Sequence, residues 1–238
     1  MSDIPKIFHL SWKDTDIVNS DSPIIENGLR NVIALNPDWD VQISTDEEVT
    51  EYLQKTVEPK LFKLIKDAHI VAKLDIWRLV KLYAEGGVYM DIDRLYNVPM
   101  STLLEPGVQS ILPTSRDYDF SHDLMITAPN SPFIAATIEL YFQRRWEGHN
   151  NVYFLGPQTY MHGITLALMG EMINTDPGVE KFEEIRAEIA KHSFLRTFRE
   201  DYPFDTLVFR NFGVLFDHEQ EKRKLYANNG MKHWTGEW

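Results

Sequence analysis

Hydrophobic and polar residues follow two different periods along the first hundred residues of the chain. Runs rich in β-branched and aromatic residues predict strands at 6–12, 40–44 and 88–93. Segments with helical spacing predict helices over about 22–35, from residue 45 or 46 onward, and over 68–85. This strand–helix–strand–helix–strand order predicts an α/β fold whose first half, about residues 1–100, is a Rossmann-like nucleotide-binding unit.

The pattern of the second half, about residues 101–238, predicts further strands and additional helices around a mixed central sheet. Strands are expected at 110–113, 123–128, 207–212 and 214–217, and helices at 132–145, 158–169 and 179–192. Gly156-Pro157 predicts a turn. Because the chain contains no internal repeat and no low-complexity linker, residues 1–238 are interpreted as one domain.

Composition removes several classes of function. Hydrophobic residues make up 43% of the 238 residues, which indicates a globular protein with a real core. The formal charge of −12 disfavours nucleic acid and anionic membranes as partners. The absence of cysteine excludes disulfides, thiolate metal sites and cysteine nucleophiles. With neither a signal-peptide pattern nor a membrane-spanning apolar run, the sequence predicts a soluble, cytoplasmic protein.

The helix expected over 68–85 carries apolar residues around nearly its whole circumference, so it should be largely buried. Asp75 and Arg78 lie three residues apart within it, on the same side. Charged side chains in an apolar sector need a partner. Two interpretations stay open: a structural ion pair between them, or a polar clamp that faces a ligand cavity.

Asp91 and Asp93 come at the end of the strand expected over 88–93, where alternate residues share one face. Two carboxylates there can hold Mn²⁺ or Mg²⁺ together with substrate phosphates. Three classes of enzyme use such a pair: dehalogenase-type phosphatases, glycoside hydrolases and nucleotide-sugar transferases. The pair can also be simply the polar end of a strand. Leu95 stands where the phosphatases have Thr or Val, which disfavours that class.

The combination of these segments resembles the DXD-motif glycosyltransferases of family 32, which are related to the catalytic domains of clostridial glucosylating toxins. The resemblance is carried by Ile4–Trp12, Asn36-Pro37-Asp38-Trp39, Asp75-Ile76-Trp77-Arg78, Gly86-Gly87-Val88-Tyr89-Met90-Asp91-Ile92-Asp93, Gly156-Pro157 and His233-Trp234-Thr235-Gly236-Glu237-Trp238. Two positions depart from the family pattern: Glu237 replaces a serine, and Asp123 stands where many members have asparagine.

The resemblance implies a GT-A fold and a metal-dependent transfer of a sugar from a nucleotide-sugar donor to a glycan or other hydroxyl acceptor, with retention at the anomeric carbon. It implies that Asp93 binds Mn²⁺ or Mg²⁺ and that Asp91 contacts the ribose and the metal's shell. Asp75 and Arg78 would hold sugar hydroxyls. These four residues are the expected catalytic set.

The resemblance also assigns the rest of the donor site. Trp12 would stack on the base, which predicts a UDP-sugar, and Tyr89 would pack beside the site. His233 and Trp238, in the closing C-terminal tail, would fold over the diphosphate. Two other classes remain: a metal-dependent hydrolase of nucleotide sugars, and a non-catalytic protein that binds nucleotide or carbohydrate.

Overall fold

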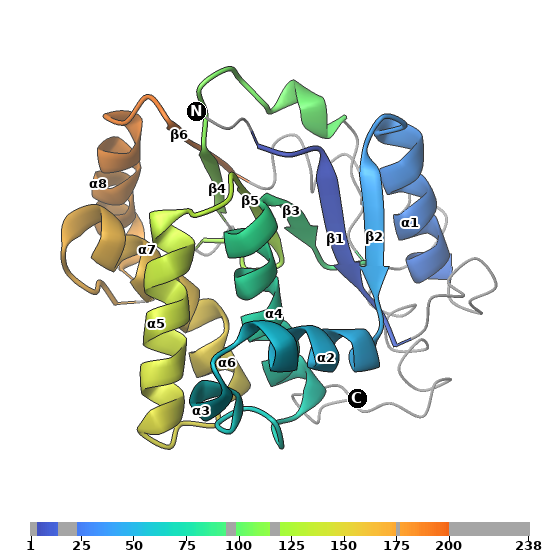
Figure 1. Cartoon of the computed structure of the whole chain (residues 1–238). Coiled ribbons are helices and arrows are strands. Elements are labelled where there is room, and N and C mark those ends of the chain that lie inside the picture. The colour runs from blue at the N-terminus through green and yellow to red at the C-terminus, as the bar shows by residue number, and fades with distance from the viewer. Residues whose placement is uncertain (1–3, 14–22, 94–98, 115–119, 175–176, 200–238) are drawn as a thin grey trace.

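The computed structural model describes residues 4–13, 23–93, 99–114, 120–174 and 177–199, and within these ranges six strands form one mixed sheet (Figure 1). The strands are β1 (Ile7–Ser11), β2 (Asp40–Ser44), β3 (Gly87–Met90), β4 (Ser110–Thr114), β5 (Leu124–Thr127) and β6 (Leu195–Arg199). They lie in the order β2-β1-β3-β5-β4-β6. β1 runs parallel to β2 and β3, β5 runs antiparallel to β3 and β4, and β4 runs parallel to β6.

Helices connect and cover these strands. They are α1 (Pro23–Leu35), α2 (Asp46–Thr56), α3 (Pro59–Phe62), α4 (Ile70–Glu85), α5 (Pro132–Trp146), α6 (Val152–Leu155), α7 (Pro157–Met169) and α8 (Gly178–Ala190). A 3₁₀ turn covers Met100–Thr102. In the described part of the chain, no helix has the length and the apolar character needed to cross a bilayer.

Two apolar clusters flank the sheet, one on each face. One joins α2, α4, α5, α7 and α8 to strand residues such as Tyr89 and Met125. The other joins α1 and the 99–108 segment to strand residues such as Phe8, Val88 and Met90. Because successive strand residues point to opposite faces, Tyr89 belongs to the first cluster and its two neighbours to the second. The result is a three-layer α/β/α arrangement, and Figure 1 shows α4 in front of the central strands and α1 next to β2.

The corner between α4 and β3 depends on Gly86 and Gly87, which have φ angles of +68° and +98°. A Cβ on Gly86 would lie 2.7 Å from Pro129, and one on Gly87 would lie 2.6 Å from the carbonyl oxygen of Ile7. These positions therefore need glycine both for backbone conformation and for space. The Gly86 carbonyl lies 2.9 Å from Nε2 of the buried His9, which supports a structural role for that histidine.

Asn36, in the segment that resembles the family, is also structural. Its side-chain amide donates to the Val32 carbonyl at 2.9 Å, and its Oδ1 accepts from the Met100 backbone N–H at 2.7 Å. The Trp39 ring in the same segment packs against Phe8, with ring centroids 4.8 Å apart. This segment joins the end of α1 to the 99–108 connection and to β1.

Most of the elements expected from the sequence are confirmed, and the differences are local. α4 begins at Ile70 rather than 68, because the side chain of His69 accepts from the Val71 N–H and caps the helix there. β6 was not predicted. The strand expected over 88–93 ends at Met90, so the prediction that Asp91 and Asp93 share one face of a strand is wrong. The strands expected at 207–212 and 214–217 lie outside the described residues.

Candidate functional site

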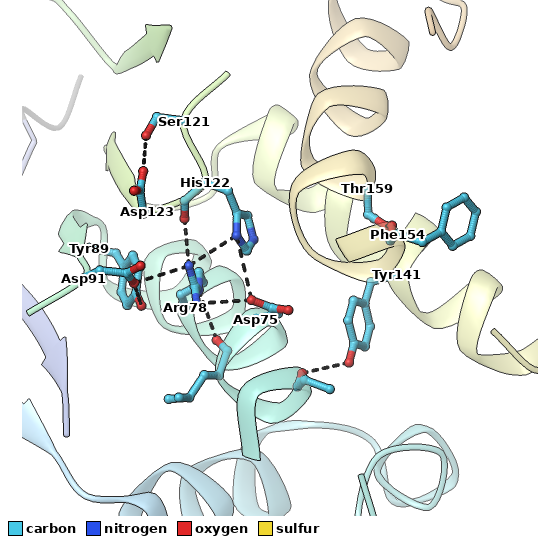
Figure 2. A network of polar contacts seen from close by, with 12 residues as sticks. Asp75, Arg78, Tyr89, Asp91, Ser121, His122, Asp123, Tyr141, Phe154 and Thr159 are labelled. Carbon is cyan, nitrogen blue, oxygen red and sulfur yellow. Dashed lines mark hydrogen bonds and ion pairs between the residues drawn. The ribbon is translucent and has the colours of Figure 1, made fainter. Parts of the chain in front are cut away.

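The candidate site lies where α4, the end of β3 and the start of β5 meet (Figure 2). α4 contributes Asp75 and Arg78, which are both buried, as expected for this helix. Tyr89 lies on β3 and Asp91 directly follows it. The backbone N–H of Asp91 donates to the Asp123 carbonyl at 2.9 Å, which joins the end of β3 to the residues just before β5.

Arg78 is the centre of this network. Its Nη2 lies 3.1 Å from Oδ1 of Asp75, and its Nη1 lies 3.6 Å from Oδ1 of Asp91. Nη1 also donates to the carbonyl oxygen of His122 at 2.8 Å and lies 3.2 Å from Nδ1 of the same residue. Nε donates to the Leu74 carbonyl at 3.4 Å. Because most of the guanidinium's five N–H groups already have protein acceptors, Arg78 has little donor capacity left for a ligand.

Asp75 has one paired and one unpaired carboxylate oxygen. Only 3% of the residue is exposed, Oδ1 faces Arg78, and Oδ2 has no hydrogen-bond partner among the described residues. Burial raises the pKa of Asp75 to about 7, against the attraction of Arg78 and with a further contribution from Asp91. A buried carboxylate with an unpaired oxygen is costly unless something binds it.

Gly156 forms the wall beside this unpaired oxygen. A Cβ at Gly156 would lie 2.7 Å from Oδ2 of Asp75 and 3.1 Å from the Val152 carbonyl. Gly156 immediately precedes Pro157 at the start of α7, as the predicted Gly-Pro turn requires. The close approach of α7 to Asp75 therefore gives a physical reason for glycine at this turn.

Tyr89 fixes the orientation of Asp91. Its hydroxyl donates to Oδ1 of Asp91 at 2.6 Å, and the Arg78 guanidinium lies 4.4 Å from the centre of its ring. Burial raises the pKa of Tyr89 well above its usual value, so the hydroxyl stays protonated and remains a donor. Tyr89 is itself fully buried, which makes it a support for Asp91 in this structure.

The carboxylates near the end of β3 are suited to a divalent cation. The Asp91 side chain is 39% exposed, and Asp93 is half-buried in the turn that follows. Partial burial raises the pKa of Asp91, Arg78 opposes the shift, and the charges of Asp123 and Asp93 add to it. Carboxylates that repel one another in this way favour a bound cation.

No group of three His, Cys, Asp or Glu side chains within the described ranges forms a metal cage by itself. Mg²⁺ in nucleotide sites is usually held by one or two carboxylates together with substrate phosphates and water. The pair Asp91 and Asp93 therefore fits a cation that arrives with a phosphate-bearing ligand.

The other expected donor-site residues are only partly placed. Trp12 follows β1, is half-buried, and its backbone N–H donates to the Ser44 carbonyl at 3.1 Å. His233 and Trp238 lie outside the described residues. The structure therefore brings Asp75, Arg78, Tyr89 and Asp91 into one network.

Sequence reasoning missed His122, and it gave Gly156 no role beyond a turn. His122 is 44 residues from Arg78 along the chain, and no local spacing connects the two. The one available signal was its position next to Asp123, which departs from the family pattern.

Comparisons with known proteins place this network in a family context. Residues 25–116, which contain Asp75, Arg78, Asp91 and Asp93, match the family described as "Glycosyltransferase sugar-binding region containing DXD motif".

Among curated proteins, the chain is similar to "Inositol phosphoceramide mannosyltransferase 1" of Schizosaccharomyces pombe, with 29% identity over 141 residues, 58% of this chain and 43% of the relative. It is also similar to "Mannosyl phosphorylinositol ceramide synthase SUR1" of Saccharomyces cerevisiae, with 25% identity over 145 residues, 60% of this chain and 36% of the relative. The matched region thus spans about two fifths of the length of these curated relatives.

The fold comparison agrees with the sequence expectation. The structure is similar to that of "PaToxG Glycosyltransferase", with a TM-score of 0.55 and 22% sequence identity over 71% of each chain. The α/β fold of GT-A type, with a mixed six-stranded sheet and flanking helices, is thereby confirmed. Through residues 25–116, the chain is similar to the family of glycosyltransferase sugar-binding regions that contain a DXD motif.

Proposed function

We propose that this protein transfers a sugar from a nucleotide-sugar donor to a hydroxyl group of an acceptor, assisted by a divalent metal ion. The observation that carries the proposal is the pairing of two features in one network. A buried carboxylate, Asp75, keeps one oxygen unpaired among the described residues, and on the other side of Arg78 the partly exposed Asp91 opens the DXD motif (Figure 2). The first feature suits a sugar hydroxyl and the second suits a metal-bound diphosphate.

The residues divide the work as follows. Asp91 and Asp93 would hold Mn²⁺ or Mg²⁺, which offsets the charge that develops on the departing nucleoside diphosphate. Asp75 would accept a hydrogen bond from a sugar hydroxyl and so hold the sugar in place for attack. Arg78 acts mainly through its neighbours, because its N–H groups hold Asp75, Asp91 and the start of β5 in position.

The names of the curated relatives favour a mannosyl group as the sugar. Trp12 is the basis for the expected uridine donor, but an indole face stacks on any base, so sugar and base are separate questions. The sugar and the base are therefore tested separately, with GDP-mannose as a donor that carries mannose and UDP-glucose as a donor that carries uridine. Retention at the anomeric carbon, implied by the family resemblance, is part of the proposal.

A ligand-dependent melting experiment tests the donor half of the proposal. A ligand that binds only the folded state raises the apparent stability of the protein. We expect GDP-mannose or UDP-glucose to raise the melting temperature in the presence of Mn²⁺, and to do so much less after the metal is removed with EDTA. No metal-dependent shift with either donor would contradict the proposal.

Turnover separates transfer from the two alternatives. A hydrolase releases free sugar at a rate that added acceptors do not change, and a binding protein releases none. We expect nucleoside diphosphate release to rise when a lipid-linked inositol phosphate or a simple mannoside is added as acceptor. The anomeric configuration of the product, measured by NMR, then tests retention.

A further inference from the structure

His122 is a buried histidine, and only one of its two ring nitrogens has a polar partner among the described residues. It lies just before β5 and is 8% exposed. Its ring packs against Tyr160 of α7, with ring centroids 5.8 Å apart. Nδ1 lies 3.2 Å from Nη1 of Arg78, whereas Nε2 has no hydrogen-bond partner within the described part of the chain.

The contact with Arg78 decides which ring nitrogen carries the proton. A guanidinium can only donate hydrogen bonds, so Nδ1 of His122 must accept. The neutral imidazole then carries its proton on Nε2. Burial, together with the charge of Arg78, lowers the pKa of His122 well below its usual value, which agrees with a neutral ring. The unpaired Nε2 is therefore a buried hydrogen-bond donor.

This donor and the unpaired oxygen of Asp75 belong to one cluster. Nδ1 of His122 lies 3.8 Å from Oδ1 of Asp75, and Arg78 contacts both atoms. Figure 2 shows the imidazole next to the Asp75 carboxylate, with Arg78 beside both. The described protein thus leaves one donor and one acceptor unpaired in the same cluster. A hydroxyl group complements such a pair, because it donates one hydrogen bond and accepts others.

We propose that His122 is a sugar-binding residue: its Nε2–H donates to a hydroxyl of the transferred sugar, while Oδ2 of Asp75 accepts from a hydroxyl of the same sugar. The inference rests on the proposed function and adds to it a donor from the start of β5. The sugar site then offers a hydrogen-bond donor as well as an acceptor, whereas Asp75 alone offers only an acceptor. Arg78, already occupied by protein acceptors, orients the two residues.

Three substitutions of His122 test the roles of its two ring nitrogens separately. His122→Gln can place an amide N–H near Nε2 but loses the acceptor at Nδ1. His122→Asn can place an amide oxygen near Nδ1 but loses the donor at Nε2, and His122→Leu loses both. His149→Gln, at an exposed position, is the matched control. Affinities are measured with Mn²⁺ for GDP-mannose against GDP and for UDP-glucose against UDP, together with melting temperatures.

The quantity compared is the ratio of the affinity for the nucleotide sugar to the affinity for the nucleotide alone. We expect this ratio to fall about tenfold in His122→Asn and His122→Leu and to be largely kept in His122→Gln. The affinity for the nucleotide alone should not change in any variant. The opposite order, with Asn intact and Gln impaired, would show that His122 serves only to hold Arg78 and would overturn the proposal. Unchanged discrimination in all three variants, or equal loss of both ligands with a lower melting temperature, would also overturn it.

The same measurements distinguish failure of the proposed function. If wild-type protein gains no affinity from the sugar in either ligand pair, the proposed donor site itself is wrong, and the role of His122 falls with it. If wild-type protein gains affinity and the variants behave like it, only the role of His122 is wrong.

Discussion

Replacing Asp75 with asparagine should make the metal-free protein more stable at alkaline pH. The same substitution should lower the affinity of the protein for the donor sugar. The new amide side chain would resemble the protonated carboxyl group in shape and could still accept from Arg78. The substitution removes a charge that the buried site disfavours, as the raised pKa of about 7 indicates. Charged and titratable neighbours are Arg78 on the same helix, Asp91 after β3, His122 before β5 and Tyr141 on α5.

The sign follows from proton linkage. The pKa of Asp75 is about 7 in the folded protein, against 3.8 for an unperturbed aspartate. Between these values the folded state keeps a proton that the unfolded state releases, so stability falls as pH rises from about 4 to about 7 and then levels off. At 1.36 kcal/mol per pH unit, the loss is about 4 kcal/mol. Asp75→Asn should recover on the order of 2–4 kcal/mol at pH 8 and little at pH 4.

Urea unfolding followed by tryptophan fluorescence measures this difference, since Trp77 on α4 is fully buried. The titrations are run in EDTA at pH 4, 6 and 8, because a bound cation would change the ionisation of Asp75. Asp67→Asn is the matched control, since the Asp67 side chain is 86% exposed. A variant that is less stable than wild type by about 3–5 kcal/mol at pH 8 would refute the reasoning and identify a stabilising ion pair instead.

Three further predictions concern the same site. Gly156→Ala should lower the free energy of unfolding by about 1–3 kcal/mol, because the new methyl group would overlap Oδ2 of Asp75. Removing that oxygen with Asp75→Ala should reduce the loss, and unfolding titrations of the single and double variants measure the difference. Equal losses with and without Asp75→Ala would contradict this explanation. Asp93→Asn should abolish Mn²⁺-dependent donor binding with little change in melting temperature, and calorimetric donor affinities equal to wild type would show that Asp93 holds no metal. Trp12→Ala should weaken nucleotide binding by about 1–3 kcal/mol, and wild-type protein should bind UDP more tightly than GDP; tighter binding of GDP in competition assays would contradict the uridine preference.

Periodicity made the first half of the fold predictable. The β1–β2–β3 region follows the local rules of strand pattern, helix cap and glycine stop, and Thr45 with Glu48 forms the reciprocal capping pair that such rules describe. β6 was missed because its partner β4 lies about 85 residues earlier and its five residues, Leu-Arg-Thr-Phe-Arg, do not alternate between apolar and polar side chains. The expected organisation as one domain stays a prediction.

The site was predictable only in part, for a related physical reason. Asp75 and Arg78 were recognisable because charges on an otherwise apolar helix need partners, and the structure places both in one polar network. Their contacts with His122 and Gly156 join segments more than forty residues apart, which no sequence period encodes. The carboxylates of the DXD motif were expected on a strand, but the chain turns away from β5 after Asp91, and Asp93 lies in that turn.

Arg78 touches both Asp75, at 3.1 Å, and Asp91, at 3.6 Å, so one guanidinium is shared between the expected sugar ligand and an expected metal ligand. A cation that draws charge from Asp91 must change the balance of charge felt by Asp75. Binding of a sugar at Asp75 and of a cation at Asp91 is then thermodynamically linked. The factor by which the metal changes the affinity for the sugar equals the factor by which the sugar changes the affinity for the metal. If the cation raises the affinity for the sugar, the donor helps to recruit its own cation when that cation is scarce, and loss of either ligand weakens binding of the other.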